Sequence, residues 1–422
     1  MIRVPTGRGQ GAAQTTMLEA MKIMWFHLMP YPALPEEFNK QHRSIWVDID
    51  PSLFDRDIMA ETYDQYIDQL VFAESCGFDA ICVNEHHNNG YGLMPSPNLI
   101  ASVLANRTSK VAITVLGNSV ALYNPPMRVA EEMAMIDLFS RGRLIAGFPV
   151  GTSMDTCYSY GVNPSHLRPR YYEGVELIRR AWTATEPFAF NGEFNKHRYV
   201  NPVPRPYQQP HPPIWIPGGG SVETWDYCAE NDFVYGALTY YGAKFVRETV
   251  GGYWNRVEAH GKDYNPNRLA VTQFVGVADT DAEAYRLYKE PAEYFFNRSL
   301  HVYPGFTDPP GYVTEASVRA RYKSAVRTAA RAKQAAHELS YDEMVENGYV
   351  VIGSPDTVRE QLEAASKELN IGNMCAMLQF GNMNDELTHH NTQLFGEKVA
   401  PDLRAMFSDW EHPFWPANAG AA

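Results

Sequence analysis

Four consecutive polar residues, Asn84-Glu85-His86-His87, bring together side chains that can exchange protons. They follow the apolar run 78–83, whose β-branched residues are typical of a buried strand. Polar side chains at the end of such a strand are expected at the mouth of a fold. A carboxylate beside two imidazoles can change its protonation near neutral pH, as general acid/base catalysis requires. We therefore predict that His86 and Glu85 are catalytic.

The second histidine, His87, fits a structural role as well as a chemical one. Neighbouring residues on a strand point to opposite faces, so His86 and His87 cannot both reach one ion without a break in the backbone. We therefore predict no metal at this site.

A second motif, Pro217-Gly218-Gly219-Gly220-Ser221, stands between an expected strand and an expected helix. Consecutive glycines expose backbone N–H groups at the positive end of the helix dipole, which suits a phosphate. The same glycines would serve turn geometry alone, and the sequence leaves both interpretations open. Of the two interpretations, we adopt the phosphate site and predict that it consists of Gly218, Gly219, Gly220 and Ser221.

The composition of the 422 residues is that of an ordinary globular protein, with 45% hydrophobic and 20% charged residues. A net charge of −13 without a Lys/Arg cluster argues against nucleic acid or an anionic membrane as a partner. No apolar run approaches the roughly 18 residues of a membrane helix. Five cysteines without a C-x-x-C pair favour reduced thiols, and hence a cytoplasmic protein.

Strand-like and helix-like patterns alternate along most of the chain, which is typical of a parallel β/α fold. The expected strands are 22–28, 80–84, 111–118, 144–150, 214–216, 233–237, 269–278 and 374–380. Eight such strands predict a TIM (β/α)8 barrel, in which the active site lies at the carboxyl ends of the strands. A doubly wound sheet is the alternative, but the G-x-G-x-x-G turn after its first strand is missing.

We predict one barrel domain over residues 21–410, between a mobile N-terminal tail, 1–20, and a C-terminal tail, 411–422. Residues 281–346 are rich in charges and alanine, and they predict a helical insertion after the seventh strand. The proline-rich and aromatic stretch 29–54 is too long for a simple connection and predicts a lid or mouth.

Several motifs together resemble those of the bacterial luciferase-like flavin-dependent monooxygenases. The matching pieces, in order, are Met21-Lys22-Ile23, Cys76-Gly77-Phe78-Asp79 with Glu85-His86-His87, Asn124-Pro125-Pro126-Met127-Arg128-Val129-Ala130-Glu131-Glu132, Asp137-Leu138-Phe139-Ser140-Arg141-Gly142-Arg143, Pro212-Pro213-Ile214-Trp215-Ile216 and Gly353-Ser354-Pro355-Asp356-Thr357-Val358. Each motif is moderately specific, whereas the ordered set spans nearly the whole chain.

The resemblance implies a barrel that receives reduced FMN from a separate flavin reductase and forms a flavin peroxide with O₂. It places His86 near the reacting edge of the flavin, and Gly117, Asn118 and Ser119 beneath the ring, often through a non-prolyl cis peptide. Many relatives have a phosphate-binding arginine after strand 4, where this chain has Val150. We therefore expect Arg170 or the glycine turn to replace it.

The substrate side of the site is expected to be aromatic, because a dry pocket protects the reactive flavin from water. We assign Phe26, Tyr31, Tyr123, Tyr158 and Tyr240 to binding a small apolar or aromatic substrate. We also expect a homodimer or higher homo-oligomer. The alternatives are a deazaflavin-dependent oxidoreductase that transfers hydride, a flavin-binding protein without catalysis, and a metal hydrolase barrel.

Overall fold

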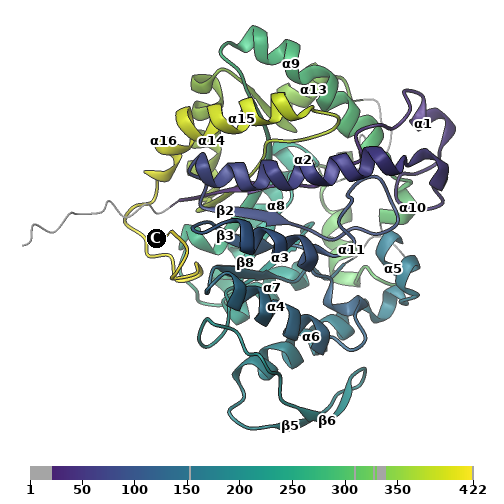
Figure 1. Cartoon of the computed structure of the whole chain (residues 1–422), viewed down its shortest axis with the longest axis vertical. Coiled ribbons are helices and arrows are strands. Elements are labelled where there is room, and N and C mark those ends of the chain that lie inside the picture. The colour runs from purple at the N-terminus through teal and green to yellow at the C-terminus, as the bar shows by residue number, and fades with distance from the viewer. Residues whose placement is uncertain (1–20, 152–153, 308–309, 327, 330–338, 421–422) are drawn as a thin grey trace, which may run out of the picture.

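The computed structural model describes residues 21–151, 154–307, 310–326, 328–329 and 339–420. The predicted N-terminal tail, 1–20, lies outside these ranges. The chain forms a barrel of eight parallel strands with helices around it, as predicted (Figure 1). The last strand pairs with the first from Lys22↔Asn373 to Trp25↔Ala376, which closes the barrel. The barrel strands are β1 (Lys22–Phe26), β2 (Ala80–Val83), β3 (Ala112–Val115), β4 (Leu144–Gly147), β7 (Ile214–Gly218), β8 (Val234–Ala237), β9 (Leu269–Val277) and β11 (Asn373–Met377).

The strand sequences explain their central position. All residues of β2, β3 and β4 are buried, as expected for parallel strands covered by side chains on one face and helices on the other. The first covering helix, α2 (Arg56–Ser75), begins where the Asp55 side chain accepts hydrogen bonds from two backbone N–H groups. It stops just before Gly77, whose φ of 81° favours glycine.

The other helices around the barrel follow in chain order (Figure 1). They are α3 (Pro97–Arg107), α4 (Met127–Phe139), α6 (Pro164–Thr183), α7 (Val222–Asn231), α8 (Ala243–Ala259), α14 (Pro355–Leu369), α15 (Asp385–Lys398) and α16 (Ala400–Arg404). A short helix, α5 (Met154–Tyr160), lies between β4 and α6 and contributes to the site described below.

Four strands end two or three residues earlier than the sequence predicted, among them β11, which ends at Met377 rather than at residue 380. The other three are β1, which ends at Phe26, β3, which ends at Val115, and β4, which ends at Gly147. The following residues leave the sheet, and their backbone groups find other partners. The Ser119 N–H, for example, donates to the Glu85 carboxylate rather than to a neighbouring strand. The carboxyl ends of the strands therefore open into loops that carry the site.

The helical insertion follows β9, the seventh barrel strand, as predicted. It contains α9 (Asp281–Tyr294), the π-helical turn η4 (Phe295–Ser299), α10 (Pro304–Thr307), α11 (Glu315–Tyr322) and α13 (Tyr341–Glu346). An additional parallel strand, β10 (Val350–Gly353), then pairs with the distal part of β9, from Phe274 to Val277. The sequence analysis missed β10, because four apolar residues between helices have no pattern of their own.

A second difference is the hairpin formed by β5 (Phe188–Asn191) and β6 (Lys196–Val200). It projects from the barrel beyond α6 (Figure 1). No alternation of apolar and polar residues marked this pair, since most of its side chains are exposed.

Two segments outside the βα repeats, the long loop 29–54 and the C-terminal residues 411–420, cover opposite ends of the barrel. In the long loop 29–54, which contains α1 (Phe38–Gln41) and η1 (Pro51–Leu53), the Ile45 N–H donates to His301 O of the insertion at 2.7 Å. At the other end, Trp215 Nε1 donates to Phe414 O at 3.3 Å and Asn267 Nδ2 donates to Glu411 O at 3.1 Å. The segment predicted as a C-terminal tail therefore lies against the barrel up to residue 420.

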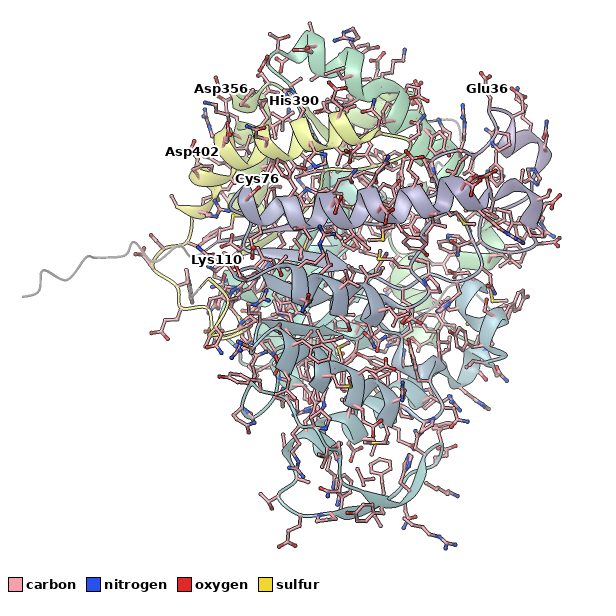
Figure 2. All side chains as sticks on the ribbon, in the orientation of Figure 1. Glu36, Cys76, Lys110, Asp356, His390 and Asp402 are labelled. Carbon is pink, nitrogen blue, oxygen red and sulfur yellow. The ribbon has the colours of Figure 1, made fainter. Side chains whose placement is uncertain are left out.

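Charged side chains are distributed over the outer surface (Figure 2). Glu36 lies at one side of the view, whereas Asp356 and Asp402 lie at the other, and all three are exposed. Among the described residues, no helix is long and apolar enough to cross a membrane.

Candidate active site

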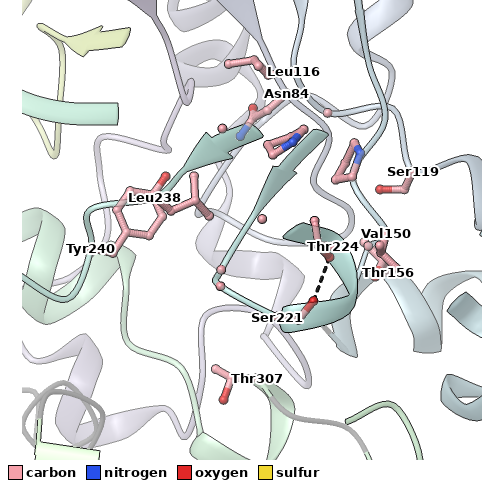
Figure 3. A pocket seen from close by; sticks show the side chains of 18 of the residues that line it. Asn84, Leu116, Ser119, Val150, Thr156, Ser221, Thr224, Leu238, Tyr240 and Thr307 are labelled. Carbon is pink, nitrogen blue, oxygen red and sulfur yellow. Dashed lines mark hydrogen bonds between the residues drawn. The ribbon is translucent and has the colours of Figure 1, made fainter. Parts of the chain in front are cut away.

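A cavity of about 430 Å³ lies at the carboxyl ends of the barrel strands (Figure 3). Loops after β2, β3, β4 and β7 line it together with the helical insertion. Asn84 and Leu116 lie on one side of the cavity, and Ser221, Thr224 and Thr307 lie on the other. Of the predicted site residues, those that line it are Glu85, His86, Gly117, Ser119, Gly218, Gly219, Gly220, Ser221, Phe26 and Tyr240.

His86 is held on several sides by other residues of the site. Its Nδ1 lies 3.1 Å from the Asp155 carboxylate of α5, and its ring meets the edge of Tyr91 at a centroid distance of 4.5 Å. Trp46, from the long loop after β1, stacks on it at 6.3 Å. The side chain is 18% exposed, so part of the ring is accessible to the cavity. The sequence analysis missed Asp155, because it lies 69 residues along the chain without any recognisable motif.

Glu85 faces the chain that follows β3. One carboxylate oxygen lies 2.7 Å from His87 Nε2, and the other accepts from the Ser119 N–H at 2.8 Å. Asn118 Nδ2 and the Tyr123 hydroxyl each lie 3.4 Å from this second oxygen. The Glu85 side chain is fully buried, and both of its oxygens are occupied. Glu85 therefore holds the segment 117–119 in place, and His87 belongs to this structural group.

The group around Glu85 also explains Tyr123 and Gly117. Burial, followed by the neighbouring Glu85 carboxylate, raises the pKa of Tyr123, so that its hydroxyl stays protonated and can donate. A Cβ atom at Gly117 would lie 2.6 Å from the backbone nitrogen of Glu85, so only glycine allows the two loops to approach this closely. Tyr123 and Asn118 thus bind Glu85 and do not line the cavity.

The expected non-prolyl cis peptide in the segment 117–119 is not found. Within the described ranges, the cis peptide bonds all precede proline, at Asn124-Pro125, Val203-Pro204 and Gln209-Pro210. This expectation from the resemblance was wrong for these residues.

Arg168 of α6 supplies a cation at the glycine turn. Its Nη2 donates to Ser221 Oγ at 3.2 Å and to the Tyr312 hydroxyl at 2.9 Å, and its Nη1 lies 3.4 Å from Thr224 Oγ1. Ser221 and Thr224 are hydrogen-bonded to each other at 2.7 Å (Figure 3). Among the described residues that line the cavity, Arg168 is the only lysine or arginine.

Arg170, which the sequence analysis offered as a replacement for the strand-4 arginine, does not line the cavity. Its Nε donates to Ala121 O at 3.2 Å, and its guanidinium lies over the Phe194 ring. Residues two apart on a helix point to different sides, which is why Arg168 reaches the turn and Arg170 does not.

The glycine turn ends at the N-terminus of α7, with Ser221 as its N-cap. The Ser221 side chain makes no capping bond to the helix, and a Cβ at Gly219 would meet no atom within 4 Å. Nearby, Glu223 in the first turn of α7 binds the insertion: Thr314 donates to its Oε1, and Ser317 to its Oε2 at 2.8 Å. The carboxylate of Glu223 is therefore hydrogen-bonded to the insertion.

The five aromatic residues assigned to substrate binding have different locations. Phe26 and Tyr240 line the cavity. Tyr31 is buried elsewhere, where its hydroxyl accepts from the Asp55 N–H, and Tyr158 is 59% exposed and packs edge-on against Phe306. Tyr123 binds Glu85, as described above. Lining residues that the sequence analysis did not single out include Tyr91, Trp46, Leu300, Val302 and Tyr312.

Residues 47–371 match the family model described as luciferase-like monooxygenase. The chain belongs to the luciferase-like monooxygenase family. This confirms the resemblance deduced from the ordered motifs, and it makes the protein a flavoprotein oxidoreductase of the monooxygenase type.

The proteins that this chain resembles catalyse different reactions. The oxygenase component of flavin-dependent trigonelline monooxygenase from Acinetobacter baylyi is 27% identical over 237 residues, which are 54% of this chain and 63% of that protein. The oxygenating constituent of 3,6-diketocamphane monooxygenase from Pseudomonas putida, a type II Baeyer-Villiger monooxygenase solved with FMN, has a TM-score of 0.69 at 20% identity. That similarity covers 90% of this chain and 98% of the other. An F420-dependent secondary alcohol dehydrogenase has a TM-score of 0.61 at 15% identity, with the same two coverages, and shares the fold.

The residues at the glycine turn of this luciferase-like family member fit the phosphate of a flavin mononucleotide. They combine a guanidinium, two hydroxyls and a helix N-terminus, all of which stabilise an anion. The Nε of Arg168 is buried and has no hydrogen-bond partner among the described residues, so the protein does not use all the donors of this side chain. Val150 lines the cavity as an apolar residue, and Arg168 brings a cation to the same cavity.

Proposed function

We propose that this protein is the oxygenase of a two-component system, which takes reduced FMN from a separate flavin reductase and oxygenates a small apolar or aromatic substrate with O₂. The observation that carries the proposal is the anion site of Arg168, Ser221 and Thr224 in the same cavity as His86. A phosphate site and a titratable group in one cavity suit a cofactor that is bound at one end and reacts at the other.

In this proposal, the FMN phosphate binds Arg168, the hydroxyls of Ser221 and Thr224, and the turn Gly218–Gly220. The segment 117–119, held by Glu85, supports the flavin ring, and Gly117 and Ser119 line the cavity beside it. Bound reduced FMN would supply the two electrons that activate O₂. Within the chain itself, His86 is the group that holds or accepts a proton next to the reacting atoms.

The lining of the cavity supports an apolar or aromatic substrate. Phe26, Trp46, Tyr91, Tyr240 and Leu300 all line the cavity. The insertion covers the cavity through Tyr312, which binds Arg168, and through the contacts of Thr314 and Ser317 with Glu223. A covered apolar site excludes water, and this protects a reactive flavin from unproductive release of hydrogen peroxide.

The partners follow from the same proposal. A relative is named as the oxygenase component of a flavin-dependent monooxygenase, which supports a separate reductase here. We further propose a cytoplasmic homodimer or higher homo-oligomer, and the five free cysteines agree with a reducing compartment. Light scattering coupled to gel filtration would measure the mass of the particle.

The experiment that tests the function is oxygen uptake with reduced flavin. The protein is mixed with chemically reduced FMN in oxygenated buffer, and O₂ consumption, H₂O₂ release and product are followed over a panel of ketones, terpenes and aromatic heterocycles. We expect a substrate in the panel to divert O₂ from H₂O₂ into product. A parallel anaerobic arm uses reduced deazaflavin, because an F420-dependent enzyme shares the fold. Oxidation of the deazaflavin with reduction of a ketone, and no oxygenation with FMN, would replace our proposal by hydride transfer.

A further inference from the structure

The hydrogen bond between His86 and Asp155 restricts the protonation of the histidine ring. The Asp155 side chain is 1% exposed, and its Oδ2 lies 3.1 Å from His86 Nδ1. The same oxygen accepts from Asn89 Nδ2 at 2.9 Å and lies 3.5 Å from the His87 N–H. The nitrogens of Asn89 and of the His87 backbone both carry hydrogen, so this oxygen acts as an acceptor towards them.

An ionised carboxylate only accepts hydrogen bonds, so the contact requires a hydrogen on His86 Nδ1. In the neutral imidazole, the other nitrogen, Nε2, then carries the lone pair. No residue in the described part of the chain hydrogen-bonds Nε2, and His86 lines the cavity. The lone pair is therefore available to a group bound there.

The position of the ring is fixed by packing as well as by this hydrogen bond. Tyr91 meets the His86 ring at an interplanar angle of 81°, and Trp46 stacks on it at 26°. A Cβ at Gly92 would lie 3.3 Å from His86 Cδ2, so the chain also passes closely beside the ring. These neighbours already fix the position of the ring. Asp155 therefore mainly determines which of the two ring nitrogens carries the hydrogen.

We propose that Asp155 is a positioning residue that fixes the Nδ1–H tautomer of His86, so that Nε2 accepts a hydrogen bond or a proton from the group bound in the cavity. The part that concerns catalysis rests on the function proposed above. The tautomer itself is a property of the protein without cofactor or substrate, and it is measured separately.

The tautomer is tested by nitrogen NMR of the full chain labelled with ¹⁵N-histidine. The chain has 13 histidines, and the His86 signals are identified by their loss in His86→Gln. At about pH 9, where ordinary histidines with a pKa near 6.5 are neutral, we expect the Nδ1–H pattern for His86 in the parent protein. In Asp155→Ala, we expect the Nε2–H form or a mixture. An Nε2–H pattern in the parent, or an unchanged pattern in Asp155→Ala, would overturn the proposal.

A kinetic cycle then tests the link to catalysis. We expect Asp155→Ala to lower product formation at saturating reduced FMN by about 10²-fold, within the range of general acid/base effects, with little change in flavin affinity. In the His86→Ala background, the same substitution should have no further effect, because it acts only through the histidine. Independent losses in the two backgrounds would contradict the proposal.

Two further variants separate this role from a loss of folding. Asp155→Asn keeps the shape and one oxygen, so it should retain the fold and lose less activity than Asp155→Ala. Asp137→Asn removes a different buried carboxylate, which lies near the C-terminal end of α4 and accepts a hydrogen bond from Gln208. This substitution should leave the His86 tautomer unchanged. If the parent protein itself shows no oxygenation, the proposed function fails while the tautomer measurement still stands.

Discussion

Arg168 Nη2 donates to Ser221 Oγ over 3.2 Å, and this contact joins the cation of α6 to the glycine turn after β7. In our proposal this contact fixes where the anionic group of the cofactor binds, because the turn alone provides backbone dipoles and hydroxyls but no positive charge. We therefore predict that Arg168→Ala weakens binding of reduced FMN by roughly 10- to 100-fold, as expected for loss of charged hydrogen bonds worth about 1.5–3 kcal/mol.

The matched control for that prediction is Arg170→Ala, which removes the same side chain two residues away. Because Arg170 contacts Ala121 and Phe194 rather than the turn, flavin affinity should stay within about twofold of the parent by the standard of a surface substitution. Anaerobic fluorescence titration measures both variants. Equal losses in the two would mean that the phosphate is bound elsewhere.

The glycine turn offers a second test of the phosphate position. Gly219 has open space around an added Cβ, whereas Gly220 has a φ of 95° that disfavours any side chain. We therefore choose Gly219→Asp, which adds a negative charge beside the proposed phosphate without backbone strain. Binding of reduced FMN should fall sharply, binding of reduced riboflavin much less, and Gly219→Ala should resemble the parent. An equal loss of affinity for both flavins would mean that the turn only connects the strand to the helix and does not bind the phosphate.

His86→Ala should separate chemistry from binding. Loss of the group that exchanges a proton next to the reacting atoms is expected to lower product yield by about 10²–10⁴-fold. Since the proposed phosphate ligands are Arg168, Ser221 and Thr224 rather than His86, the affinity for reduced FMN should change little. Product analysis with O₂ uptake and H₂O₂ release checks this. A yield within about threefold of the parent would remove His86 from the catalytic assignment.

Glu85→Ala should act on the fold of the site. It leaves the Ser119 N–H and His87 without their buried acceptor, and each unsatisfied group costs about 1–3 kcal/mol. We expect a lower free energy of unfolding in urea and weaker flavin binding. Tyr123→Phe removes a single, longer contact with the same carboxylate and should cost about 1 kcal/mol or less. Full stability in Glu85→Ala, with loss of chemistry alone, would return Glu85 to a directly catalytic role.

The isolated protein should contain little bound flavin. The sequence has neither a dinucleotide fingerprint nor a covalent attachment motif, so we expect FMN to behave as a dissociable substrate. The visible spectrum after gel filtration measures this. Stoichiometric oxidised flavin that survives the column would argue against the two-component proposal.

Local sequence was sufficient where neighbouring residues determine the structure. Residues 80–83 are apolar throughout, so they form a buried strand, and Glu85 and His86 follow at its carboxyl end. The same holds for the turn Gly218–Ser221 between β7 and α7, which lines the cavity as its position between strand and helix predicted. The barrel itself followed from the alternation of such elements.

Contacts between segments that are distant in the sequence could be identified only from the tertiary structure. The choice of Arg168 over Arg170 depends on the rotational phase of α6 relative to the barrel, which the helix sequence does not reveal. Asp155 reaches His86 only because α5 packs beside the loop after β2. Tyr31 does not line the cavity, because its hydroxyl accepts from the Asp55 N–H, and Tyr158 of α5 is exposed. The periodicity of a sequence indicates which face of an element is buried. Which residues that face contacts depends on the packing of the whole chain.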